Sequence, residues 1–232
     1  MEQKVHRYFI INKPYNMVSQ FISPDNVGLL KDVPFKFPEG IHAIGRLDNY
    51  SERLLILTTN KKVTKLLFES KTPHKRTYLV QVRNIVTPEK LLQLQTGVSI
   101  RIKGGAYYTT PPCEVLIVDK PIDLYKRENE FKEGLPNTWL LITLTEGKFH
   151  QVRKMVDAVG HRCKRLIRIS IEDLALSNLQ PGEVKELEEK DFFERLKIEF
   201  QIKRLHYKNR QFVLRAYSTI DYSVEQIQSQ HI

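Results

Sequence analysis

Apolar and polar positions along the chain follow two periods, one typical of strands and one typical of helices. Residues 76–83 alternate, so Tyr78, Val80 and Val82 fall on one side of a predicted strand. Further strands are predicted by short apolar or alternating runs bounded by turn residues, at 7–11, 54–59, 112–118, 139–145 and 163–171. The last of these places Ile167 on one face and both Leu166 and Arg168 on the other.

Three segments have helical periodicity. Residues 151–159 carry apolar side chains at i, i+3, i+4 and i+7, and Gly160 is a natural helix stop. Residues 88–95 follow Thr87, a good capping residue, and begin with proline, which favours the first helical position. Residues 61–69 form the third. Strands and helices alternate irregularly, so we expect an α+β fold with a mixed, largely antiparallel sheet.

Two segments interrupt this pattern. Residues 120–137 are charged and carry proline and glycine, and a loop of this length is typically functional or mobile. We expect it to be partly disordered or to contact a partner. Beyond about residue 191 basic and aromatic residues mix, which predicts a main domain over 1–190 and a basic C-terminal extension over 191–232. That extension is either an added RNA-binding arm or structure packed on the core.

Charge and cysteine content narrow the class of protein. The formal net charge is +10 and the pI is about 9.5, which favours a polyanionic partner such as RNA or DNA, although a basic surface alone would also fit. Cys113 and Cys163 form neither a zinc pattern nor a disulfide framework, so we expect a reducing, cytoplasmic location. No apolar stretch is long enough to span a membrane, and residues 1–6 lack the apolar h-region typical of a signal peptide.

Three residues are candidates for chemistry. Asp48 ends the loop Gly45-Arg46-Leu47-Asp48, and alone it would be read as a solvated turn residue. Tyr78 near the start of a strand would alone be read as a core residue. Arg153 lies beside the apolar stripe of its helix and could pair with Asp157, but a base N-terminal to an acid is the weaker orientation. This pairing therefore accounts poorly for Arg153.

Five motifs occur together in the order and spacing of a known family. They are Asn12-Lys13-Pro14, Gly45-Arg46-Leu47-Asp48, Arg76-Thr77-Tyr78, Glu146-Gly147 with Gln151-Val152-Arg153-Lys154-Met155, and Leu166-Ile167-Arg168. On these motifs the chain, from about residue 7 to 188, resembles the pseudouridine synthases that modify ribosomal RNA. Gln20-Phe21 and the passage from loop 120–137 into Thr138-Trp139 make it similar to the large-subunit branch, type E. We expect the chain to start with the catalytic domain, over 1–190, whereas many members of that family carry a small RNA-binding domain first.

The resemblance implies a role for each matching position. Asp48 matches the essential aspartate, Tyr78 the tyrosine that stacks on the target base, and Arg153 the arginine that pairs with the aspartate. An aliphatic residue, Leu166 or Ile167, would lie against the base. The expected substrate-binding residues are Lys13, Arg46, Lys148, Gln151, Lys154, Leu166, Ile167 and Arg168. We expect the basic residues among them to contact phosphate, together with Arg162, Lys164 and Arg165, which flank these segments.

Five positions depart from the family pattern. Arg53 stands where relatives usually have glycine, and Arg76 where lysine is common. Phe149-His150 replaces the usual Asn-Arg pair, and Lys154 replaces arginine. The changes at residues 53, 149 and 150 concern substrate contacts more than catalysis.

The function implied by the resemblance is isomerisation of a specific uridine to pseudouridine in 23S ribosomal RNA, with base flipping. The reaction has no net redox change, and the sequence contains neither a glycine-rich nucleotide loop nor a metal-ligand cluster, so we expect no cofactor and no metal. We also expect a monomer. We further expect Arg153 to keep Asp48 charged in a dry pocket. The alternatives are the same reaction on small-subunit ribosomal RNA or transfer RNA, and a non-catalytic RNA-binding assembly factor.

Overall fold

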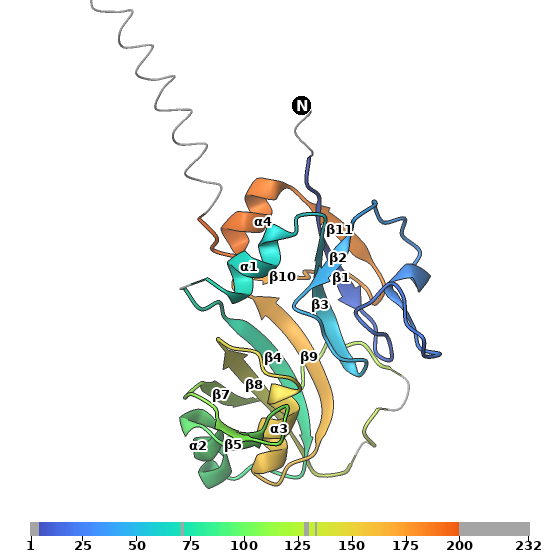
Figure 1. The fold of residues 1–232 in the computed structure, drawn as a ribbon. Coiled ribbons are helices and arrows are strands. Elements are labelled where there is room, and N and C mark those ends of the chain that lie inside the picture. The colour runs from blue at the N-terminus through green and yellow to red at the C-terminus, as the bar shows by residue number, and fades with distance from the viewer. Residues whose placement is uncertain (1–4, 71, 128–129, 133, 200–232) are drawn as a thin grey trace, which may run out of the picture.

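The computed structural model describes residues 5–199 apart from 71, 128, 129 and 133 (Figure 1). Its main sheet has the order β11-β1-β3-β9-β4-β8-β7, with β2 added to β3 and β10 added to β9. The strands of this sheet are β1 (Tyr8–Lys13), β2 (His42–Ile44), β3 (Ser51–Thr58), β4 (Arg76–Arg83), β7 (Glu114–Val118), β8 (Asn137–Leu144), β9 (Cys163–Ile171), β10 (Leu174–Ala175) and β11 (Val184–Leu187). A separate two-stranded ribbon consists of β5 (Ser99–Arg101) and β6 (Tyr107–Thr109).

Four α-helices and a short 3₁₀ helix accompany the sheet. They are α1 (Lys62–Phe68), α2 (Pro88–Thr96), α3 (Gln151–Ala158), α4 (Glu189–Arg195) and η1 (Leu30–Asp32). Each of the six predicted strands and three predicted helices is confirmed within three residues at its ends, and the expected α+β class with a largely antiparallel sheet is confirmed. The strands missed are two to four residues long, too short to display a period of two.

Both pairs of helices cover the same face of the sheet. α1 and α4 bury Leu67, Phe192 and Phe193 against β1 and β3, while α2 and α3 bury Leu94 and Met155 against β4 and β8. Figure 1 shows β4 and β9 running between these two helical ends. The apolar stripe predicted for residues 151–159 is buried throughout. The helix-covered face therefore has a core at each end and a space between them.

One parallel strand pair brings distant segments together in that space. β3 lies parallel to β9, and Ser51 pairs with Leu166. β4 lies antiparallel on the other side of β9, and Tyr78 pairs with Arg168 beside a β-bulge. Because the loop containing Asp48 leads directly into β3, the register sets Asp48, Tyr78 and Arg168 around one point of the helix-covered face.

The structure adds detail to two of the predicted segments. The charged loop 120–137 was expected to be partly disordered or to contact a partner, and among its described residues Tyr125 and Arg127 are hydrogen-bonded to the buried Glu52. The predicted domain boundary at residue 190 falls inside α4, which packs in the core with Leu196 and Ile198 just after it. Residues 200–232, the rest of the predicted extension, lie outside the described residues.

Candidate active site

The loop that carries Asp48 is held from both sides. Gly45 has a φ of +59°, and a Cβ there would lie 2.9 Å from the ring of Phe68, so glycine fits both the backbone and the space. The Ser19 hydroxyl donates to the Leu47 carbonyl and accepts from the Leu47 amide, at 2.9 and 3.0 Å. The Asp48 carboxylate itself accepts the Tyr50 amide at 2.9 Å. These contacts fix the direction of the carboxylate before any substrate is bound.

Asp48 and Arg153 form a two-pronged ion pair. Nε and Nη2 of Arg153 donate to the two carboxylate oxygens of Asp48 at 3.0 and 3.1 Å. The same Nη2 donates to the hydroxyl of Ser51 at 3.1 Å. Parallel N–H···O bonds between guanidinium and carboxylate are strong and directional. The predicted pairing of Asp48 with Arg153 is confirmed, and the alternative pair with Asp157 does not form.

This environment decides the charge of Asp48. Burial raises the pKa of the Asp48 carboxyl, but the hydrogen bonds and charge of Arg153, helped by Ser51 and His150, outweigh burial and hold the pKa below its usual range. Burial would also lower the pKa of the Arg153 guanidinium, and its bonds to Asp48 reverse this so that the pKa is raised. Both partners are therefore ionised at neutral pH, in a partly desolvated site.

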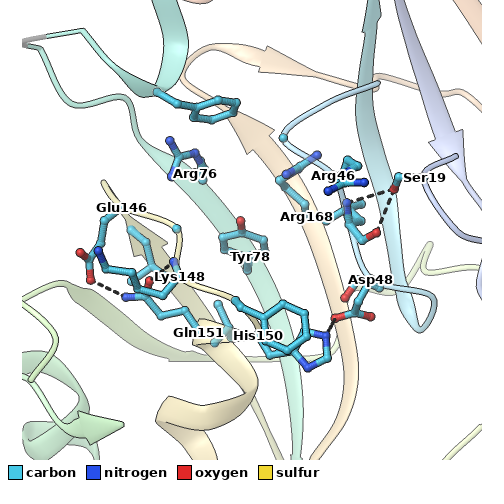
Figure 2. Close-up of a pocket in the computed structure, with 18 of the residues that line it drawn as sticks. Ser19, Arg46, Asp48, Arg76, Tyr78, Glu146, Lys148, His150, Gln151 and Arg168 are labelled. Atoms are coloured by element: carbon cyan, nitrogen blue, oxygen red, sulfur yellow. Dashed lines mark hydrogen bonds and ion pairs between the residues drawn. The ribbon is translucent and has the colours of Figure 1, made fainter. Parts of the chain in front are cut away.

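Asp48 faces a cavity of about 830 Å³ between the two helical ends. Figure 2 shows Tyr78 within it, between Arg168 and Lys148, with His150 beside Asp48. Leu166 supplies an aliphatic surface in the same cavity. An ionised carboxylate, an aromatic ring and an aliphatic side chain facing one space form a site suited to a planar, uncharged ring next to a reacting bond.

Some of the predicted substrate-binding residues line the cavity and others do not. Those that line it are Arg46, Lys148, Gln151, Leu166 and Arg168. Ile167 packs on the opposite face of the sheet with Leu79 and Trp139, as strand alternation requires, so Leu166 and not Ile167 is the aliphatic residue of the site. Lys154 lies outside the cavity lining, with its ammonium 5.4 Å from the Phe149 ring.

Lys13 does not face the cavity, contrary to the expectation that it contacts phosphate. Its side chain is 0 % exposed, and its ammonium donates to the backbone carbonyls of Pro14 and Met17 and, at 3.5 Å, of Asn49. Burial lowers the pKa of this ammonium to about 7, against the opposing charges of Asp48 and Glu52. Lys13 therefore bonds to the backbone of Asn49, the residue after Asp48, from the side away from the cavity.

The comparisons with known proteins agree with this geometry. Residues 7–158 match the family model described as RNA pseudouridylate synthase. The chain belongs to this family. Relatives named "Ribosomal large subunit pseudouridine synthase E" include one from Vibrio parahaemolyticus, 37 % identical over 78 % of this chain and 74 % of the relative. Another, from Xanthomonas axonopodis, is 34 % identical over 74 % of this chain and 89 % of the relative.

A solved structure shares the fold. The "Crystal structure of pseudouridylate synthase" superposes with a TM-score of 0.67 at 26 % identity, over 84 % of this chain and 76 % of the other. The resemblance drawn from five sequence motifs, including the type E branch, is thus confirmed, and the protein is a pseudouridine synthase.

Behind the site, this synthase contains a buried ionic cluster. Glu52 is 0 % exposed and receives bonds from Arg165, at 3.0 Å to each oxygen, and from Arg127 at 2.8 Å. The Tyr125 hydroxyl also donates to it. Arg165 was expected to contact phosphate, but it is fully buried in this cluster. The cluster fastens the loop containing Arg127 to the sheet beside the Asp48 loop.

Sequence reasoning missed several residues of the synthase site. Ser51 completes the Arg153 contacts, His150 lies 3.9 Å from the Asp48 carboxylate, and Arg76 lines the cavity. Alternation along β4 places Arg76 on the same face as Tyr78, so this residue could have been found. No sequence signal distinguished Ser51, and His150 was noted only as a departure from the family pattern, because their contacts depend on segments about 100 residues away.

Two further findings concern the described part of the chain only. Among these residues no three His, Cys, Asp or Glu side chains are grouped so that they could hold a metal ion. Within the same ranges, no helix has both the length and the hydropathy needed to cross a membrane.

Proposed function

We propose that this synthase isomerises a specific uridine of 23S ribosomal RNA, with Asp48 as the catalytic carboxylate and without a cofactor. The reaction breaks the glycosidic bond at N1 and rejoins the base to the sugar through C5, while N1 gains the proton that C5 loses. The substrate class follows the names of the relatives, which are ribosomal large-subunit pseudouridine synthases. The single observation that carries the role of Asp48 is its ionised, preoriented state in the cavity.

The cavity fits a nucleotide that has left its stack. A target base in folded RNA must be flipped out to reach a buried carboxylate, which costs a few kcal/mol. Stacking on an aromatic face such as Tyr78 returns about 1–3 kcal/mol. Leu166 lines the same cavity and offers the second apolar surface. The proposed path therefore places the uracil between Tyr78 and Leu166, with its glycosidic bond near Asp48.

Two buried guanidinium groups support an oxygen-rich substrate. Arg168 is 2 % exposed and Arg76 is 6 % exposed, and both line the cavity. Within the described residues, Nη2 of Arg168 and Nε of Arg76 are buried without a hydrogen-bond partner. Burial lowers the pKa of both groups. Buried donors without partners are costly, and the phosphate or carbonyl oxygens of a bound nucleotide would satisfy them.

The test is to express the protein in cells that lack their own large-subunit synthase of this type. Pseudouridine would be mapped across all ribosomal and transfer RNA for the wild type, Asp48→Asn and Asp157→Asn. Asp157 is an exposed residue of α3, so its substitution makes the same chemical change outside the cavity. Thermal unfolding of each purified variant checks that the fold is retained.

The expected result is one 23S site restored by the wild type and by Asp157→Asn, and absent with folded Asp48→Asn. Restoration by Asp48→Asn would overturn the catalytic assignment. A site in small-subunit or transfer RNA would keep the reaction and change the substrate. No site with any variant, although the protein is folded and bound to RNA, would support the non-catalytic binding alternative.

A further inference from the structure

An exposed aromatic ring stands at the edge of the catalytic cavity. Phe149 is 70 % exposed and is among the residues that line the cavity. Its ring stacks on that of His150, with centroids 3.9 Å apart and planes at 16°. Single exposed apolar residues are common and need no explanation. This one differs because it is ordered by a stacked neighbour and opens onto a reactive site.

The backbone holds the two rings in this arrangement. His150 has a φ of +55°, in the left-handed region that residues with a Cβ rarely occupy. The turn is closed by the Lys148 carbonyl, which accepts the Gln151 amide at 3.1 Å, and by the Gln151 side chain, which accepts the Lys148 amide at 2.8 Å. Backbone conformations of this kind persist where the surrounding structure enforces them, and they cluster at functional sites.

The stacked pair connects the reacting group with the outside of the cavity. On its inner side, the His150 ring lies 3.9 Å from the Asp48 carboxylate. Figure 2 shows the two side chains next to each other. The ammonium of Lys154 lies over the Phe149 ring, 5.4 Å from its centroid. This long side chain can give way to a base that stacks on the exposed ring and can then pair with the phosphate of that nucleotide.

We propose that Phe149, stacked on His150, is a platform for a nucleobase adjacent to the target uridine. When the target leaves its stack to reach Tyr78, the neighbouring base loses a stacking partner, and Phe149 at the cavity edge replaces it. Lys154 then lies near the phosphate of that neighbour. The existence of a target uridine rests on the proposed function, but stacking of a base on Phe149 can be measured without turnover.

The test uses variants that distinguish the aromatic ring of Phe149 from its apolar bulk and from the charge of Lys154. Phe149→Leu removes the aromatic face but keeps an apolar side chain, Phe149→Trp keeps and enlarges the face, and Lys154→Gln removes only the charge. The probe for binding is a short single-stranded RNA with one 2-aminopurine among uridines, whose fluorescence is quenched by stacking. Binding is measured in the Asp48→Asn background, and turnover is measured separately on 23S transcripts.

The expected result is quenching with Phe149 and Phe149→Trp and its loss in Phe149→Leu, with RNA affinity about 5- to 150-fold weaker. On transcripts, Phe149→Leu should raise KM by a similar factor and leave kcat within about twofold, because the platform binds RNA and takes no part in bond breaking. Lys154→Gln should retain quenching and reduce the salt dependence of binding.

Two outcomes distinguish this proposal from the proposed function. Undiminished quenching and unchanged KM in folded Phe149→Leu would overturn the platform, whatever the wild type does to transcripts. Loss of quenching in Phe149→Leu, with no pseudouridine formed by the wild type, would support the platform and overturn the catalytic proposal.

Discussion

Asp48 and Arg153 are 105 residues apart in the sequence and form the central contact of the site. This pair controls the charge of Asp48. Partial burial in the cavity raises the pKa of the carboxyl, and the guanidinium of Arg153 lowers it again, so that the charged form is favoured. Ser51 and His150 contribute to the same effect from the two neighbouring segments. At the scale of single residues, the site is a carboxylate held charged in a fixed direction.

The first prediction concerns Arg153. In Arg153→Met, burial dominates and the pKa of the Asp48 carboxyl rises, so its ionised fraction falls as pH decreases. We expect kcat at about pH 6 to drop at least about 100-fold, with a smaller loss at higher pH. The measurement is a pH profile of pseudouridine formation. Arg153→Lys keeps the charge, so its kcat should lie between those of the wild type and Arg153→Met. If activity declined at the same acidic pH in Arg153→Met and in the wild type, Arg153 would not control the pKa of Asp48.

The second prediction concerns Lys13, whose pKa burial lowers to about 7 in the folded protein. Above that pH the unfolded chain holds one more proton at this lysine than the folded chain, so the free energy of unfolding rises with pH. The slope is about 1.4 kcal/mol per pH unit between roughly pH 7 and 10. Lys13→Met lacks this contribution. In urea unfolding, the free energy of unfolding of the wild type minus that of the variant should therefore increase with pH. A constant difference would contradict it.

At the scale of elements, β3 changes face in its middle. Glu52 lies on the face opposite the helices, where it bonds to Arg165 and to Arg127 of the loop, while Leu54 lies on the helix-covered face with α1 and α4. Two residues apart, they would share a face in a regular strand. Arg53 between them has a φ of +74°, which breaks the alternation. This reversal lets one strand supply both the ionic cluster behind the site and the core beside it.

The third prediction follows from that backbone. A residue with a Cβ in the left-handed region carries a cost of about 1–2 kcal/mol that glycine avoids. We expect Arg53→Gly to be more stable than Arg53→Ala by about 1 kcal/mol, after allowing for the greater freedom of glycine in the unfolded chain. Both variants remove the same side chain, so denaturant unfolding of the two isolates the backbone term. Equal stability would show that φ at this position is not costly.

At the scale of the whole molecule, the nine-stranded sheet of the described residues carries a helical pair at each end, and the cavity that Asp48 faces lies between them. The formal net charge of +10 accompanies exposed cations at the cavity, among them Arg46 and Lys148. Such charges attract a polyanion from a distance and release its counterions on contact. RNA affinity should therefore depend on the molecule's charge as well as on the fit of one nucleotide.

The fourth prediction is the salt dependence of RNA binding. Three contacts with single-stranded phosphates imply a log–log slope of about −2, or roughly 20-fold weaker binding between 50 and 200 mM salt. Lys148→Gln should reduce that slope by about 0.7. Lys190→Gln, an exposed change on α4 outside the cavity lining, should leave it unchanged. A flat response to salt would exclude a phosphate-based contribution.

Local patterns determined much of the fold. The alternation of residues 76–83 and the stripe of residues 151–159 depend only on neighbours in the sequence, and both elements form as predicted. The motifs around Asp48, Tyr78 and Arg153 were sufficient to indicate the family and the central ion pair, because their order and spacing are specific.

Tertiary structure decided what each charge does. Lys13 and Arg165 have the same side-chain chemistry as a phosphate-binding residue, yet both are buried and bonded to the protein itself. His150 reaches Asp48 only because α3 and the Asp48 loop meet across the sheet. A cation's role depends on whether water, a carboxylate or an open cavity surrounds it, and contacts between distant segments determine those surroundings.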